Sequence, residues 1–135
     1  MRSTFVFPFA KLESRRHRLG ITKAAVSKRT GVSLPTVNRI FGGKEPSPTL
    51  GNLQAIAATL GLVIQIGASV EIQESQDAHE FRKARAFSKA KRLVGLVQGT
   101  MALESQAVGS KALEQMIEQT AFELLTGPSS RLWND

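Results

Sequence analysis

The residues best suited to chemistry lie in one basic segment, between Ile21 and Leu60. Inside it, the run Leu34 to Phe41 carries arginine, asparagine and threonine at helical spacing. Arginine can bind guanine bidentately, asparagine can bind adenine, and an apolar side chain can contact a thymine methyl group. These types therefore predict a helix that reads base edges in the major groove of DNA. The candidate base-reading residues are Leu34, Thr36, Asn38 and Arg39.

Further polar and basic residues surround this run and predict contacts with phosphates. Thr22 and Lys23 begin the preceding helix, where backbone N–H groups and the helix dipole favour an anion. The candidate phosphate-contacting residues are Thr22, Lys23, Ser33, Lys44, Arg15 and Arg16.

The charge of the chain is distributed unevenly. The net charge is +7, and residues 1–66 alone hold ten Lys/Arg against Glu13 and Glu45, or +8. Residues 67–135 have a net charge of −1. Such an asymmetry favours a polyanionic partner for the first half.

Glycines, prolines and capping residues divide the first half into four expected helices. Thr22 and Ser33 stand at expected N-caps, and Pro35 fits a first turn. Gly31 permits the sharp turn between the two central helices, whose shared core should contain Val26, Val32, Val37 and Ile40. The expected helices are Ala10–Leu19, Lys23–Arg29, Leu34–Phe41 and one that runs from Ser47-Pro48 to Leu60.

Two β-prone runs flank these helices, Thr4–Phe7 and Leu62–Ile66. A single strand is not stable alone, so the second run needs a partner. Thr4–Phe7 can supply that partner, from the same chain or from a twin subunit.

The second half predicts a helical extension. We expect a long helix from Asp77 to Val108 with the apolar stripe Ala90, Leu93, Val97 and Met101, and a last helix from Ser110 to Thr126. The tail Ser129–Asp135 is expected to be loose, although Leu132 and Trp133 could dock. A second stripe, Arg82, Arg85, Lys89 and Arg92, is interpreted as a solvated face, with a phosphate contact or an acidic partner as alternatives.

Nothing in the sequence argues for catalysis. The chain has no cysteine, and its two histidines, His17 and His79, lie far apart without a carboxylate cluster. We therefore expect no enzyme activity, no metal and no cofactor. No apolar run is long enough to span a membrane and no signal-peptide core is present, so a cytoplasmic protein is expected.

The segment from Ile21 to Ile40 resembles the lambda-repressor/Cro-like, or XRE, helix-turn-helix family. The resemblance continues through Gly43-Lys44, Pro48-Thr49-Leu50 and the run Ile56 to Gly61. Three positions depart from the family pattern, since glutamine is common at Lys23, alanine at Ser27 and glutamate at Phe41. The resemblance implies a lambda-repressor-like helical bundle that binds double-stranded DNA.

The sequence thus predicts a mainly α protein with a small β element, in which residues 1–67 bind DNA and residues 68–135 form a helical extension. The resemblance, together with a strand after the fourth helix, favours a homodimeric repressor of a palindromic operator. The expected role is the antitoxin and autorepressor of a toxin–antitoxin operon, with a toxin as protein partner. One alternative is a stand-alone phage or metabolic repressor that dimerises through its second half, and another is a protein-interaction adaptor without DNA binding.

Overall fold

The structure is a computed structural model that describes residues 7–103 and 109–134, with side chains described for 7–96 and 109–134. It is mainly helical with one small sheet, which confirms the predicted fold class. The chain divides into two compact units, Met1–Ala78 and His79–Asp135. The predicted boundary after residue 67 falls inside a β hairpin, so the first unit extends further than the sequence indicated.

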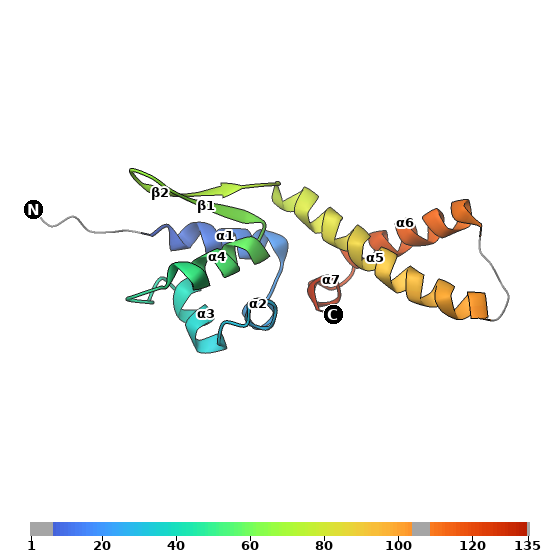
Figure 1. Cartoon of the computed structure of the whole chain (residues 1–135), viewed down its shortest axis with the longest axis horizontal. Coiled ribbons are helices and arrows are strands. Elements are labelled where there is room, and N and C mark those ends of the chain that lie inside the picture. Colours follow the sequence, from blue (N-terminus) through green and yellow to red (C-terminus); the bar gives the residue numbers. More distant parts are fainter. Residues whose placement is uncertain (1–6, 104–108, 135) are drawn as a thin grey trace, which may run out of the picture. The chain divides into compact units, whose positions relative to one another are not determined.

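Four helices and a hairpin make the first unit (Figure 1). The second and third helices contact each other, the second also contacts the fourth, and the first contacts the third. The elements are α1 (Phe9–Leu19), α2 (Lys23–Thr30), α3 (Leu34–Phe41), α4 (Leu50–Thr59), β1 (Leu62–Ile66) and β2 (Val70–Glu74).

Local hydrogen bonds fix the turn between α2 and α3. The Thr22 hydroxyl accepts the backbone N–H of Ala25 at 3.1 Å, which confirms the predicted cap of α2. Gly31 ends α2 at φ 78°, a conformation that favours glycine. The Ser27 hydroxyl donates to the carbonyl of Val32 at 2.6 Å across this turn. Serine at this position, where the family often has alanine, therefore adds a bond that holds the two helices together.

The predicted side-chain cap of α3 and the predicted start of the fourth helix are wrong. The Ser33 side chain accepts no backbone N–H of α3, and its hydroxyl donates to the hydroxyl of Thr36 at 2.9 Å. The fourth helix begins later than Ser47-Pro48, since the hydroxyl of Thr49 accepts the N–H of Asn52 at 3.2 Å and caps it there.

The core of the first unit is aliphatic, and the four side chains predicted to share it are buried. Phe41 is buried as well, within its own unit, where the Arg16 guanidinium lies 5.6 Å from its ring centroid. Its burial accounts for an aromatic residue where the family frequently has glutamate. The fully buried apolar side chains include Leu12, Leu19, Ile21, Val26, Val37, Ile40, Ile56 and Leu60.

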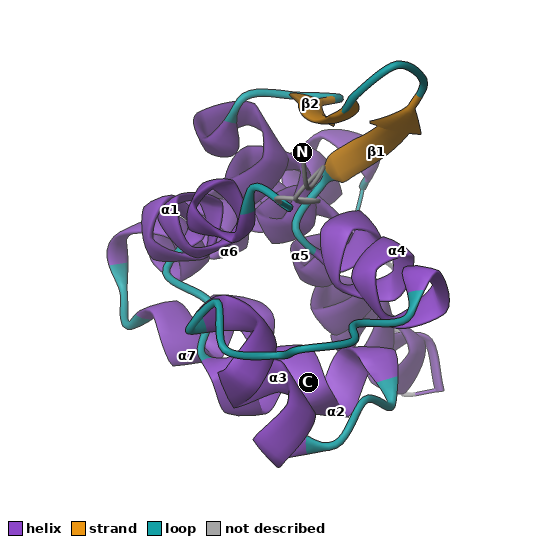
Figure 2. Cartoon of the chain, turned by 90° about the vertical axis from the view of Figure 1, so that its left-hand side faces the viewer, coloured by secondary structure: helices purple, strands orange, loops and turns teal. Residues whose placement is uncertain are grey.

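The strand at Leu62–Ile66 is confirmed. Its partner is β2, which runs antiparallel with Ile64 opposite Ile72 (Figure 2). The partner suggested from sequence, Thr4–Phe7, lies outside the described residues except for Phe7, which is buried and not in a strand. Alternation of apolar and polar residues from Val70 to Glu74, after a glycine-containing loop, is the signal that could have revealed β2.

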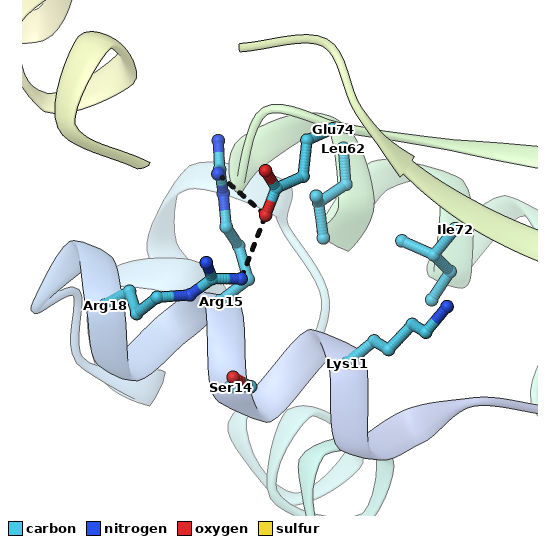
Figure 3. Close-up of a pocket in the computed structure, with 7 residues that line it drawn as sticks. All are labelled: Lys11, Ser14, Arg15, Arg18, Leu62, Ile72 and Glu74. Atoms are coloured by element: carbon cyan, nitrogen blue, oxygen red, sulfur yellow. Dashed lines mark hydrogen bonds and ion pairs between the residues drawn. The ribbon is translucent and has the colours of Figure 1, made fainter. Parts of the chain in front are cut away.

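A buried arginine ties α1 to the end of the first unit. Arg15 donates from Nε to the carbonyl of Leu60 and from Nη2 to the carbonyl of Gln76, both at 2.8 Å. Its Nη1 lies 3.4 Å from Glu74, which also pairs with the more exposed Arg18 at 2.9 Å (Figure 3). Burial lowers the pKa of the Arg15 guanidinium, and the Glu74 carboxylate opposes that shift.

The second unit contains α5 (Ala78–Leu103), α6 (Ser110–Thr126) and α7 (Ser129–Trp133). The expectation of a loose tail is wrong, because α7 buries Leu132 and Trp133. The Trp133 ring stacks on Phe81 of α5 with centroids 5.9 Å apart. Ser110 is the first residue of α6 and makes no cap. Residues 104–108, the predicted end of the long helix, and the side chains of Val97 and Met101 lie outside the described part.

The cationic stripe on α5 binds the C-terminal segment of its own unit. Arg82 donates to the carbonyl of Leu125 at 3.4 Å, and Arg85 donates to that of Leu132 at 3.0 Å. The buried Lys89 ammonium donates to the carbonyls of Arg131 and Asn134. Cations satisfy the last carbonyls of a helix and complement its dipole. The solvated face that the sequence suggested is therefore wrong for these three residues.

Among the residues described, no helix is both long enough and apolar enough to cross a lipid bilayer.

Candidate nucleic-acid interface

Helix α3 presents one polar face and one buried face. Val37 and Ile40 are fully buried, and their positions hold the opposite side of the helix away from the core. All four candidate base-reading residues lie outside this buried stripe. Leu34, Asn38 and Arg39 are exposed and Thr36 is half-buried. The major groove of B-DNA is wide enough to admit an α-helix, so side chains exposed on α3 could reach base edges.

Hydrogen bonds between side chains order this face before any ligand binds. Thr36 accepts the hydroxyl of Ser33 at 2.9 Å and Nη2 of Arg39 at 3.2 Å. Arg39 also donates from Nε to Oε2 of Glu45 at 2.9 Å. We call these four side chains, Ser33, Thr36, Arg39 and Glu45, the α3 network.

Glu45 is the member of the α3 network that sequence reasoning missed. Its side chain is only 14% exposed, whereas that of Arg39 is 49% exposed. The hydrogen bond from Arg39 lowers the pKa of the Glu45 carboxyl, and a backbone bond from Ser47 contributes to the same shift. The sequence did offer a signal for Glu45. It is one of only two acidic residues among the first 66, and it follows the end of α3 by four residues.

The structure separates the candidate phosphate ligands into two groups. Thr22 and Lys44 are exposed, and Lys23 is half-exposed at the N-terminus of α2. Ser33 is also exposed, although its hydroxyl proton is directed to Thr36. These four side chains are at least partly exposed to solvent.

Arg15 and Arg16 are placed differently. Arg15 is completely buried and donates to backbone carbonyls, so the predicted phosphate contact is wrong for this residue. The Arg16 guanidinium forms a two-point pair with Glu13, with N–O distances of 2.9 and 2.6 Å, and also donates to the carbonyl of Ile21 at 3.0 Å. That pair lowers the pKa of Glu13, since a hydrogen-bonded guanidinium stabilises the carboxylate. Arg16 thus serves the packing of α1 and Phe41.

Within the described residues, no three His, Cys, Asp or Glu side chains gather in a way that could hold a metal ion.

Comparison with known proteins identifies the class of the first unit. A family model described as Helix-turn-helix matches residues 12–63, which cover α1 from Leu12 through α4 and the start of β1. No curated protein and no solved structure shows a significant match to the chain.

The match and the geometry agree. Residues 12–63 of the first unit are thus similar to helix-turn-helix domains, with α2 and α3 in the place of the two central helices.

Proposed function

We propose that the protein is a sequence-specific DNA-binding repressor that reads its operator through α3. The observation that carries this proposal is the exposure of Asn38 and Arg39 on α3, a helix held in the core by the fully buried Val37 and Ile40. An arginine and an asparagine on one helix face can each make bidentate contacts with a purine edge.

Electrostatics support a polyanionic partner for this unit. The first unit as the structure divides the chain, residues 1–78, holds ten Lys/Arg against five Asp/Glu, so it keeps a net charge of +5. Lys44 and Lys23 flank the two ends of the reading unit and would contact phosphates on either side of the groove. Such contacts fix the register of the protein on the duplex.

We further propose that the repressor acts as a homodimer on an inverted repeat. A single α3 contacts one short half-site, and two-fold symmetric proteins of this class read two half-sites one helical turn apart. The hairpin leaves Val63 and Ile66 exposed, 49% and 61% respectively, which offers apolar surface for a second copy.

The second unit favours a protein partner, and on this basis we propose the role of antitoxin and operon autorepressor. Three large apolar side chains of this unit are exposed: Leu93 (37%), Leu96 (67%) and Phe122 (62%). Three of the six Lys/Arg side chains of α5, namely Arg82, Arg85 and Lys89, donate to backbone carbonyls of residues 125–134, which leaves fewer of them for a DNA role. A toxin that covers the apolar residues would couple protein binding to operon control.

Selection from a random duplex library tests the DNA-binding role. The full-length protein should enrich a two-fold symmetric sequence and release it as salt rises, because phosphate contacts displace counterions. Enrichment of no sequence, or binding that is independent of salt, would contradict the proposal.

Co-expression with the product of the adjacent gene tests the antitoxin role. The intact chain should bind that product and relieve its toxicity. A chain that represses its operator but neither binds nor neutralises the neighbour would be a stand-alone repressor.

A further inference from the structure

A carboxylate beside a DNA-reading helix is electrostatically unfavourable, since it faces the phosphates of the duplex. Glu45 is such a carboxylate, because it pairs with Arg39 on the exposed side of α3. The first 66 residues hold one other acid, Glu13, which is paired with Arg16 on α1. We therefore expect Glu45 to contribute something to DNA recognition that offsets this repulsion.

The geometry of the arginine indicates what the role is. A guanidinium has five N–H donors in a rigid planar fork. Glu45 accepts the donor on Nε, and Thr36 accepts one donor on Nη2. Three donors remain, including the two on Nη1. These remaining donors are available for the O6 and N7 acceptors of guanine.

Both acceptors are themselves held in place. Glu45 accepts a backbone bond from Ser47 and is only 14% exposed, so its carboxylate has little freedom to move. Thr36 lies on the helix and receives the Ser33 hydroxyl at 2.9 Å. A long side chain that is already ordered loses less conformational entropy when it binds than one that is free.

We propose that Glu45, together with Thr36, is a positioning residue that orients the Arg39 guanidinium for recognition of one guanine. The inference rests on the proposed role of α3 in reading DNA and adds a specificity-determining residue to it. Glu45 lowers the general affinity for DNA by repulsion and raises the discrimination at one base pair by ordering Arg39.

The effect should be confined to one position of the operator. Ordering one rotamer-rich side chain corresponds to about a twofold to tenfold change in affinity. Removing Glu45 should therefore reduce the preference for G·C over A·T at the Arg39 position by about twofold to tenfold. Preferences at other positions should stay the same, and affinity for arbitrary duplex should rise.

The experiment uses the full-length chain and a duplex selected from a random library. The variant Arg39→Ala first identifies the base pair at which preference relaxes. Glu45→Ala is then compared with Glu13→Ala, a matched control that removes the other arginine-paired carboxylate of this half. Thr36→Val, which keeps the side-chain shape and removes the acceptor, is the second test of the α3 network. Affinities are measured on the selected duplex and on its single-base-pair variants.

The inference expects Glu45→Ala and Thr36→Val to lose preference at the Arg39 base pair, with Glu13→Ala unchanged there. Unchanged preference in Glu45→Ala, or an equal loss at every base pair, would overturn it.

A measurement without DNA separates this inference from the proposed function. In the free protein, the Arg39 Nε–H should exchange slowly with solvent, as detected by nitrogen-15 NMR, and should exchange faster in Glu45→Ala. Equal exchange rates in the two proteins would show that Glu45 does not hold Arg39. If the wild-type chain selects no DNA sequence, the proposed function is overturned, whatever the exchange rates are. The specificity role of Glu45 would then be overturned as well.

Discussion

Replacing Arg15 with methionine tests how the first unit is held together. The change keeps most of the aliphatic volume and removes a fully buried guanidinium that donates to the carbonyls of Leu60 and Gln76. A hydrogen bond to a charged group contributes about 1.5–3 kcal/mol, and breaking a buried charged network costs about 3–5 kcal/mol. Since Arg15→Met breaks two such bonds and leaves the carbonyl of the buried Leu60 without this donor, the unit should lose about 3–5 kcal/mol of unfolding free energy.

Hydrogen exchange detected by mass spectrometry is the suitable assay, because the only tryptophan, Trp133, lies in the other unit. Amides of α1 and α4 should exchange about 10²- to 10³-fold faster in Arg15→Met than in the wild type. The matched control is Arg18→Ala on the same helix, whose 56%-exposed side chain also pairs with Glu74. An exposed pair contributes about 0–1 kcal/mol, so this control should change little. Equal effects of the two substitutions would refute the structural role given to Arg15.

Three further predictions concern binding. Lys23→Ala should weaken binding to all sequences alike and reduce the salt slope by about one unit, as measured by titration at several salt concentrations, whereas a sequence-dependent loss would contradict a phosphate role. The wild-type footprint should show two half-sites with centres about 34 Å apart or a multiple of that, and protection of one unsymmetrical half-site would contradict the dimer. A fragment ending at Ala78 should keep weak DNA affinity and lose the neighbouring gene product in a pull-down; equal capture by the fragment would place the partner site in the first unit.

Local signals were sufficient to predict the helices of the first unit. Thr22 before an apolar pattern, glycine at positions 20 and 31, and Pro35 in a first turn each restrict the backbone within a few residues. Burial of Val37 and Ile40 follows from helical periodicity alone, and it places Asn38 and Arg39 outside. The exposed face of the candidate site was therefore predictable from the sequence.

The remaining features depend on contacts between distant residues. Arg15 and Arg16 are neighbours of the same type, but only the first meets the carbonyls of Leu60 and Gln76 when the helices assemble. The stripe on α5 does not indicate which carbonyls Lys89 binds. They belong to Arg131 and Asn134, which lie 42 and 45 residues further along the chain. Such partners are set by tertiary packing, which a pattern along the chain does not encode.

The boundary after residue 67 that the sequence suggested was also affected by contacts between distant residues. Cutting there would remove β2 and the carbonyl of Gln76, both of which belong to the first unit. The boundary at Ala78 preserves the hairpin and the bonds of Arg15.

The measurement that tests the central claim most directly is the affinity of Arg39→Ala for the selected duplex and its single-base-pair variants. Loss of one bidentate base contact should weaken binding by about 1–3 kcal/mol, or about 5- to 150-fold, and should relax preference at one base pair in each half-site. Binding of the intact operator with unchanged affinity and unchanged preference would contradict the assignment of α3 as the helix that reads DNA.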